Sequence, residues 1–136
     1  MGKWLALGLL GLALLAGCTP QDRVMTTIEG GALVFIACTP IEGVQHIEAS
    51  QADTVLWHSR GEDGVFGPTT PITFGVDPSG FVTDMGPISV EFNGERIYFS
   101  LTNTAVDSRT WVIDTDDLVE GKWLDESGRL HDEHCT

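Results

Sequence analysis

The sequence predicts an all-β domain, a small antiparallel β-sandwich or barrel. Three observations support this fold class. Short segments rich in β-branched and aromatic residues recur along the chain, and clusters of glycine, proline and other turn formers separate them. No segment beyond the first 18 residues keeps the apolar period of 3.6 residues that a surface helix shows. Many short strands with frequent turns are typical of sandwiches and barrels.

The first expected strand is the apolar run at residues 31–38, which Thr39-Pro40 ends. A run of this length with β-branched and aromatic members, followed by a proline, favours a buried central strand over a helix. Residues 44–50 give a weaker strand pattern.

Residues 53–59 alternate more regularly than the segment before them. A strand there places Val55 and Trp57 on one face and Leu56 and His58 on the other. We therefore expect a half-buried strand at this position.

Residues 60–80 are rich in glycine and proline and predict an irregular loop with short extended pieces, such as residues 72–76. A long irregular stretch on a compact domain is a candidate recognition surface. A series of tight turns would give the same composition.

The clearest local pattern predicts a hairpin within residues 88–101, with Asn93-Gly94 as its turn. Asn-Gly favours a two-residue type I′ turn because both residues tolerate positive φ. Pairing about this turn sets Glu91 opposite Arg96 and gathers the apolar side chains on the other face. The apolar stripe would comprise Ile88, Val90, Phe92, Ile97, Phe99 and Leu101.

Two further strands are expected near the end of the chain. One covers residues 109–114, with Trp111 and Ile113 on one face, and residues 120–125 form a candidate last strand. An immunoglobulin-like topology is one form such a sandwich could take. Glu133 occupies the place of that family's corner tyrosine, however, so the sequence predicts the architecture and not the family.

The amino terminus has the order of parts of a secretory signal peptide. Lys3 supplies a cationic start, residues 5–15 form an apolar run, and small residues follow. The apolar run is too short to cross about 30 Å of hydrocarbon as a permanent helix, which needs roughly 20 residues.

The run ends in Leu15-Ala16-Gly17-Cys18, which resembles the lipobox of bacterial lipoproteins. The resemblance covers only about the first 20 residues. It implies that the Cys18 sulfur is diacylglycerated and that cleavage before it makes Cys18 the first mature residue. The alternative is an ordinary signal peptide with a cysteine near its cleavage site. Two or three acyl chains would anchor the protein stably without any spanning helix.

The resemblance implies a three-part chain. Residues 1–17 are the lipoprotein signal peptide, residues 18–27 a lipidated tether, and residues 28–136 a β-rich extracytoplasmic domain. The expected location is the cell membrane, on its extracytoplasmic side, with the lipid on Cys18 as the attachment.

The chain is strongly acidic, with a formal net charge of −13. Removing residues 1–17 leaves six Lys+Arg against 20 Asp+Glu, a net charge of −14. Nucleic-acid binders carry basic patches, so nucleic acid is not an expected partner. An anionic membrane surface would also repel such a domain, so the lipid rather than charge would hold it there.

Two cysteines remain once Cys18 is assigned to the lipid. Cys38 and Cys135 are an even pair in an oxidising compartment, which predicts a disulfide. Two free thiols are the alternative, because a sequence does not show whether two cysteines approach within bridging distance.

No catalytic motif is present, and we expect neither an enzyme nor a cofactor. The chain lacks a Gly-x-Ser-x-Gly elbow, a Ser-x-x-Lys pair and a phosphate-binding glycine loop. His131 and His134, with acidic neighbours, are the most suggestive metal ligands. A structural zinc site normally needs four ligands, and Cys135 would be lost to a disulfide, so no metal site is expected.

The expected function is therefore that of a membrane-anchored lipoprotein whose domain binds an envelope protein or has a structural part in the envelope. The alternative is an envelope metal-binding protein that uses His131 and His134. A small hydrolase is the third possibility.

Overall fold

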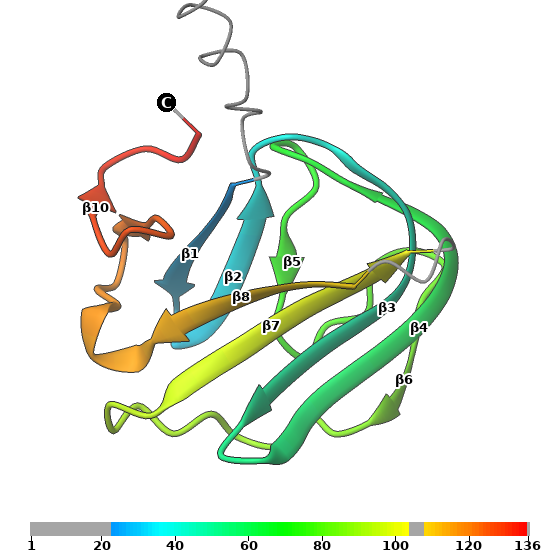
Figure 1. The fold of residues 1–136 in the computed structure, drawn as a ribbon, viewed down its shortest axis with the longest axis horizontal. Helices are drawn as coiled ribbons and strands as arrows, with labels where there is room; N and C mark the ends of the chain where they lie inside the picture. The colour runs from blue at the N-terminus through cyan, green and yellow to red at the C-terminus, as the bar shows by residue number, and fades with distance from the viewer. Residues whose placement is uncertain (1–22, 104–107, 136) are drawn as a thin grey trace, which may run out of the picture.

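The computed structural model describes residues 23–103 and 108–135 and shows two antiparallel five-stranded sheets packed as a sandwich (Figure 1). The predicted all-β class is confirmed. Sheet A, in spatial order, contains β10 (Leu130–His131), β9 (Trp123–Leu124), β1 (Val24–Glu29), β2 (Ala32–Ala37) and β5 (Ile72–Thr73). Sheet B contains β6 (Val82–Met85), β4 (Thr54–Phe66), β3 (Ile41–Gln51), β7 (Arg96–Asn103) and β8 (Ser108–Asp114).

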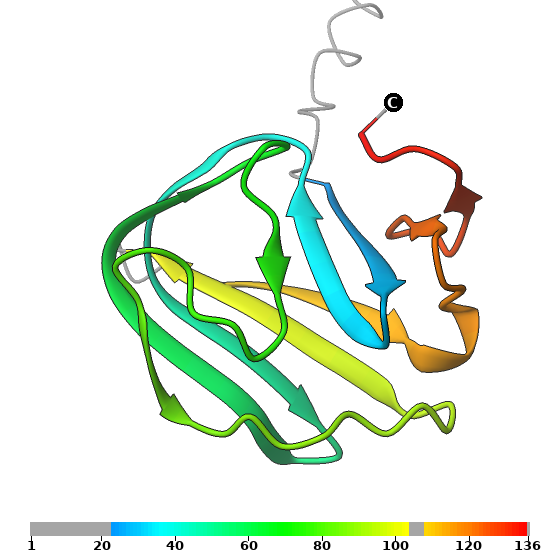
Figure 2. The same cartoon turned by 180° about the vertical axis from the view of Figure 1, so that it is seen from behind.

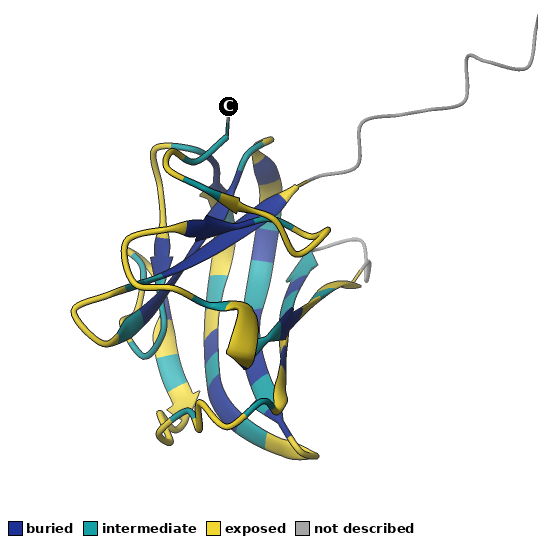
Figure 3. Ribbon diagram, turned by 90° about the vertical axis from the view of Figure 1, so that its left-hand side faces the viewer, coloured by how far each residue is buried: buried dark blue, intermediate teal, exposed yellow. Residues whose placement is uncertain are grey.

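The main core lies between the two sheets, where alternate side chains of each sheet meet. The rings of Phe35 in β2 and Phe99 in β7 stack in parallel, with centroids 3.9 Å apart. Trp57 of β4 is fully buried in the same core. Figure 3 shows the buried residues along the strands and the exposed ones mainly in the connections. The strand expected at residues 31–38 is β2, which lies between β1 and β5, and its residues 33–37 are buried.

One tight hairpin lies at the centre of each sheet. Glu29 pairs with Ala32 around Gly30-Gly31 in sheet A. Gln51 pairs with Thr54 around Ala52-Asp53 in sheet B. All four turn residues have positive φ, at 58° and 83° for the glycines and at 48° and 62° for Ala52 and Asp53. Positive φ at both central positions is the requirement of a type I′ turn, whose twist matches that of the flanking strands.

A double substitution in the Ala52-Asp53 turn is expected to stabilise the domain. A non-glycine residue in the left-handed region costs roughly 1–2 kcal/mol, and both side chains are exposed. Ala52→Asn with Asp53→Gly should therefore raise the free energy of unfolding by about 1 kcal/mol in urea denaturation. Gly30→Ala is the matched opposite change: it has open space for a Cβ and φ +58°, so it should lower stability by a similar amount. A destabilised Asn-Gly variant would contradict the assigned turn.

The hairpin predicted around Asn93-Gly94 is wrong. β7 pairs with β3 along one edge and with β8 along the other, so no edge of β7 is left for residues 88–92. That segment bonds elsewhere: the Ile88 amide donates to the Leu56 carbonyl at 2.7 Å. The Glu91 amide donates to the Gln51 side chain at 3.1 Å.

The predicted apolar stripe is therefore only partly right, and Val90 is a partly buried member that packs against the core. Its members on β7, namely Ile97, Phe99 and Leu101, are buried, whereas Ile88 and Phe92 are about half exposed. Arg96 pairs in register with Asp114 of β8 rather than with Glu91.

The domain begins before the end of the tether that is expected over residues 18–27. Val24–Thr27 belong to β1 and are buried. Thr26 and Thr27 make this segment look polar, but the Thr27 hydroxyl donates to the Lys122 carbonyl at 2.6 Å. A buried threonine with a satisfied hydroxyl packs well in a strand. The signal peptide at residues 1–17, Cys18 and the first part of the tether lie outside the described residues.

The strand expected over residues 53–59 is confirmed as β4, which extends to Phe66 and takes in the first part of the predicted loop. The expected faces are only partly right, because a register shift sets Val55 opposite Ser50 on the outer face while Trp57 lies inward. Gly61 and Gly64 fit this strand because the Phe81 ring lies where their Cβ atoms would be, within 2.7 Å. The irregular path begins only after Phe66 and contains the short strand β5, as the sequence predicts for residues 72–76.

The two strands expected near the end of the chain are present. β8 covers residues 109–114, with Ile113 buried, and β9 contains Trp123. β9 is not the last strand, because β10 follows it and pairs with it.

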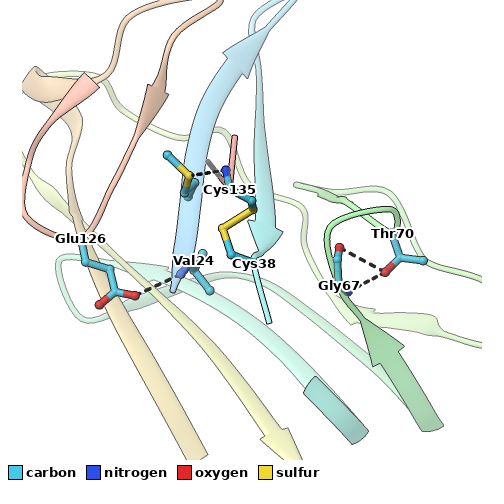
Figure 4. Close-up of a disulfide and its surroundings, with 7 residues drawn as sticks. Val24, Cys38, Gly67, Thr70, Glu126 and Cys135 are labelled. Atoms are coloured by element: carbon cyan, nitrogen blue, oxygen red, sulfur yellow. Dashed lines mark hydrogen bonds between the residues drawn. A yellow bond between two sulfur atoms is a disulfide. The ribbon is translucent and has the colours of Figure 1, made fainter. Parts of the chain in front are cut away.

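The carboxyl-terminal segment closes a second, smaller core on the outer face of sheet A. Met25, Val34 and Ile36 point away from the main core and pack with Trp123. The predicted disulfide between Cys38 and Cys135 is present and fastens this segment beside the ends of β1 and β2 (Figure 4). The disulfide of an immunoglobulin domain joins its two sheets. Here both cysteines flank strands of sheet A.

Candidate functional site

Four polar side chains gather on the outer face of sheet B, and we call them the His46–His58 cluster. His46 comes from β3, His58 and Arg60 from β4, and Asp84 from the edge strand β6. Side chains of a strand alternate between its two faces. Ile47 and Ser59 are fully buried, so their neighbours in the cluster face outward.

The cluster is joined by a continuous chain of polar contacts. Nδ1 of His46 lies 3.2 Å from Nε2 of His58, and the two rings are stacked with centroids 5.2 Å apart. Nδ1 of His58 contacts one carboxylate oxygen of Asp84. The other oxygen accepts from Nη2 of Arg60 at 2.8 Å. The hydrogen bonds from Arg60 and then from His58 hold the pKa of Asp84 below its ordinary value.

These contacts fix the tautomer of His58. An ionised carboxylate only accepts hydrogen bonds, so Nδ1 of His58 carries a proton and donates it to Asp84. In the neutral ring, Nε2 of His58 then holds a lone pair that faces His46. The position of the proton on the His58 ring follows from these contacts. The arrangement can pass a proton between rings or present nitrogen lone pairs to a metal ion.

Asp77 holds β6, and with it Asp84, against β4. Its carboxylate accepts from the Ser59 hydroxyl at 2.7 Å and from the Thr83 amide at 3.0 Å. Burial raises the pKa of Asp77, but hydrogen bonds from Thr83 and Ser59 outweigh it, so the pKa lies below its ordinary value. The indole of Trp57 also donates to the Thr83 hydroxyl at 2.9 Å. The cluster is therefore anchored to the core.

A serine-type triad would add a nucleophilic oxygen or sulfur hydrogen-bonded to the imidazole. Within residues 23–103 and 108–135, His46 and His58 make no hydrogen bond to a hydroxyl or thiol.

An open groove lies further along the same face, beside the β3–β4 turn. It has a volume of about 560 Å³, within the usual range of ligand sites. Ser50 of β3 pairs in register with Tyr98 of β7, so both belong to the outer face. The groove is lined by Ser50, Ala52, Asp53, Glu95, Arg96 and Tyr98.

The residues that the sequence suggested as metal ligands each have a different partner. Nε2 of His131 lies 2.7 Å from an Asp125 oxygen, and the His134 ring lies against Trp123 with centroids 5.0 Å apart. Cys135 is in the disulfide. Among the residues that the structure describes, no three histidine, cysteine or acidic side chains converge on one point.

Asp125 instead organises the turn between β9 and β10. Its carboxylate accepts from the Ser127 amide and hydroxyl and from the Arg129 amide, at 2.6–3.0 Å. Burial raises the pKa of Asp125, but hydrogen bonds from Ser127, His131 and Arg129 outweigh it and hold the pKa well below its ordinary value. The role of the Asp125 carboxylate in this turn is therefore structural.

The His46–His58 cluster was missed by the sequence analysis. The β3–β4 ladder pairs His46 with Arg60 and Glu48 with His58, so the two histidines lie diagonally across the two strands. A recognised turn at Ala52-Asp53 would have been the signal for this pairing, but Ala-Asp is not a recognisable hairpin pair. Asp84 depends on the pairing of β6 with β4, which no local pattern marks.

In the part of the chain that the structure covers, no helix is long and apolar enough to cross a membrane. Comparison of the chain with protein-family models, with curated proteins and with solved structures finds no match in any of the three.

Proposed function

We propose that this chain is a lipid-anchored extracytoplasmic lipoprotein, and that its β-domain is a binding or structural component of the cell envelope. The observation that carries the proposal is Leu15-Ala16-Gly17-Cys18 at the end of a short apolar run. The disulfide between Cys38 and Cys135 supports it, because structural disulfides persist in oxidising compartments.

The position of β1 supports a domain held close to the membrane. β1 begins at Val24, six residues after Cys18, and six extended residues reach about 20 Å. Val24, the first residue of β1, lies near Cys38 and Cys135 (Figure 4), where β1 begins and β2 ends at the top of Figure 1. The β3–β4 turn lies at the opposite end, at the bottom of Figures 1 and 2. Attachment through Cys18 would therefore turn the β3–β4 turn and its groove away from the membrane.

The outer face of sheet B is the surface best placed for a partner. It carries both the groove beside the β3–β4 turn and the His46–His58 cluster. Polar side chains continue across β7 and β8, where the hydroxyls of Ser100 and Thr110 lie 2.8 Å apart. This partly concave face also exposes Tyr98 and Val112, so it suits an envelope protein partner bound through a mixed polar and apolar interface.

Intact mass of the full-length protein extracted from membranes tests the anchor. We expect the wild-type chain to have lost residues 1–17 and to carry acyl mass on Cys18. Cys18→Ala should remain uncleaved and unacylated, because the modified sulfur is absent. Cys38→Ser is the matched control and should be acylated like the wild type, with only its disulfide lost. An unacylated wild-type chain with its first 17 residues intact would refute the proposal.

A further inference from the structure

We propose that His46 and His58 form an open two-histidine site for a divalent transition metal ion, with Zn²⁺ as the representative. The site does not depend on lipidation of Cys18. It lies in the His46–His58 cluster and is distinct from the His131–His134 segment that the sequence suggested.

The spacing of the two nitrogens fits one metal ion. Nδ1 of His46 and Nε2 of His58 are 3.2 Å apart. Zn–N bonds are about 2.0–2.1 Å long and the geometry is tetrahedral, so two imidazole nitrogens on one zinc lie about 3.3 Å apart. A metal ion that replaces the shared proton therefore needs almost no change in the distance between the two nitrogens. The proton on Nδ1 of His46 moves to Nε2 of the same ring by exchange with water.

Asp84 supplies the outer partner that metal-binding histidines usually have. Such a histidine donates its second ring N–H to a carboxylate, which fixes the tautomer and the ring orientation. His58 makes this contact to Asp84 through Nδ1, so its neutral ring presents the lone pair of Nε2 to the ion. Arg60 binds the other Asp84 oxygen and holds the carboxylate in place.

The surroundings suit a cation and leave it accessible. Glu48 of β3 stands directly opposite His58 in the β3–β4 ladder, on the same outer face. The chain carries a net charge of −13, whereas Arg60 is the positive member of the cluster. The His58 side chain is 19% exposed, so water can reach the ion. Imidazole ligands favour zinc, copper and nickel over calcium or magnesium, and water would complete the coordination.

Calorimetric titration of the chelator-treated full chain in detergent with Zn²⁺ tests the site. We expect one ion per chain. His46→Ala and His58→Ala should each weaken binding at least about tenfold, and Asp84→Asn should weaken it by about 10–100-fold, the usual effect of losing an outer-shell partner. Unfolding midpoints measured without metal show whether each variant is folded, and His46→Gln and His58→Gln keep the side-chain volume if an alanine variant is not.

His131→Ala and His134→Ala are the matched controls and should bind Zn²⁺ like the wild type. Zn²⁺ should also raise the unfolding midpoint of the wild type and not that of His58→Gln, because an ion bound only to the folded state stabilises it. Absence of binding, or binding that survives His46→Gln and His58→Gln, would overturn the proposal. Loss of binding in the His131 or His134 variant would overturn it as well and move the site to the carboxyl terminus.

Discussion

Cys135→Ser is expected to lower the free energy of unfolding by about 4–5 kcal/mol. The disulfide closes a sequence separation of 97 residues, and in the chain-entropy model a loop of about that length stabilises the folded state by this amount. The disulfide also holds the segment that covers Met25, Val34 and Ile36, so its loss should expose this second core. Typical small domains are stable by about 5–15 kcal/mol. The effect is therefore a large part of the total.

Urea denaturation with and without reductant measures this change. Reduced wild type and the Cys38→Ser/Cys135→Ser double variant should both match Cys135→Ser, because all three lack the cross-link. Part of the segment has independent attachments: the Val24 amide donates to Glu126 at 3.0 Å, and Asp125 organises the β9–β10 turn. The strand signal in circular dichroism should therefore persist in dilute buffer. Equal stability of the oxidised and reduced wild type would contradict the prediction.

Local patterns were sufficient for the fold class and for most strands. Burial of residues 33–37 follows from their continuous apolar character, and the inward face of β7 follows from the alternation of Ile97, Phe99 and Leu101. Both are properties of single strands. A strand's hydrophobic period predicts which of its faces is buried, whatever its neighbours are.

Pairing between strands was not predictable in the same way. Asn93-Gly94 has the composition of a hairpin turn, yet only Gly94 has positive φ there. The actual hairpin turns are Gly30-Gly31 and Ala52-Asp53. β3 and β8 each pair with β7 through seven positions. This tertiary pairing outweighs the local preference of Asn-Gly.

The candidate site depends on those pairings and was hidden for the same reason. His46 and His58 meet only because the β3–β4 register is set by a turn of Ala52 and Asp53, neither of which signals one. Asp84 reaches them from an edge strand that pairs with β4 after an irregular connection. Three separate strands supply the cluster, and no spacing in the sequence links His46, His58 and Asp84.

Phe99→Ala is the core substitution with the largest expected effect, about 3–5 kcal/mol lost from the free energy of unfolding, because removing a fully buried phenylalanine leaves a cavity. Phe99 is 1% exposed. Its ring stacks on Phe35 of the opposite sheet at an interplanar angle of 2° and also lies near Trp111, with centroids 6.1 Å apart. The lost ring therefore contacts both sheets, and urea denaturation should show a lower midpoint with an unchanged slope.

Tyr98→Ala is the matched control, since Tyr98 precedes Phe99 in β7 and points to the opposite face. Tyr98 is 41% exposed and lines the groove, so its removal should cost less than about 1 kcal/mol. The two variants share the strand, both neighbouring strands and the loss of an aromatic ring. Their difference therefore reports burial between the sheets rather than strand propensity. Equal losses would mean that sheet-to-sheet packing does not dominate stability here, because a ring between two sheets and a ring on the outer face would then contribute alike.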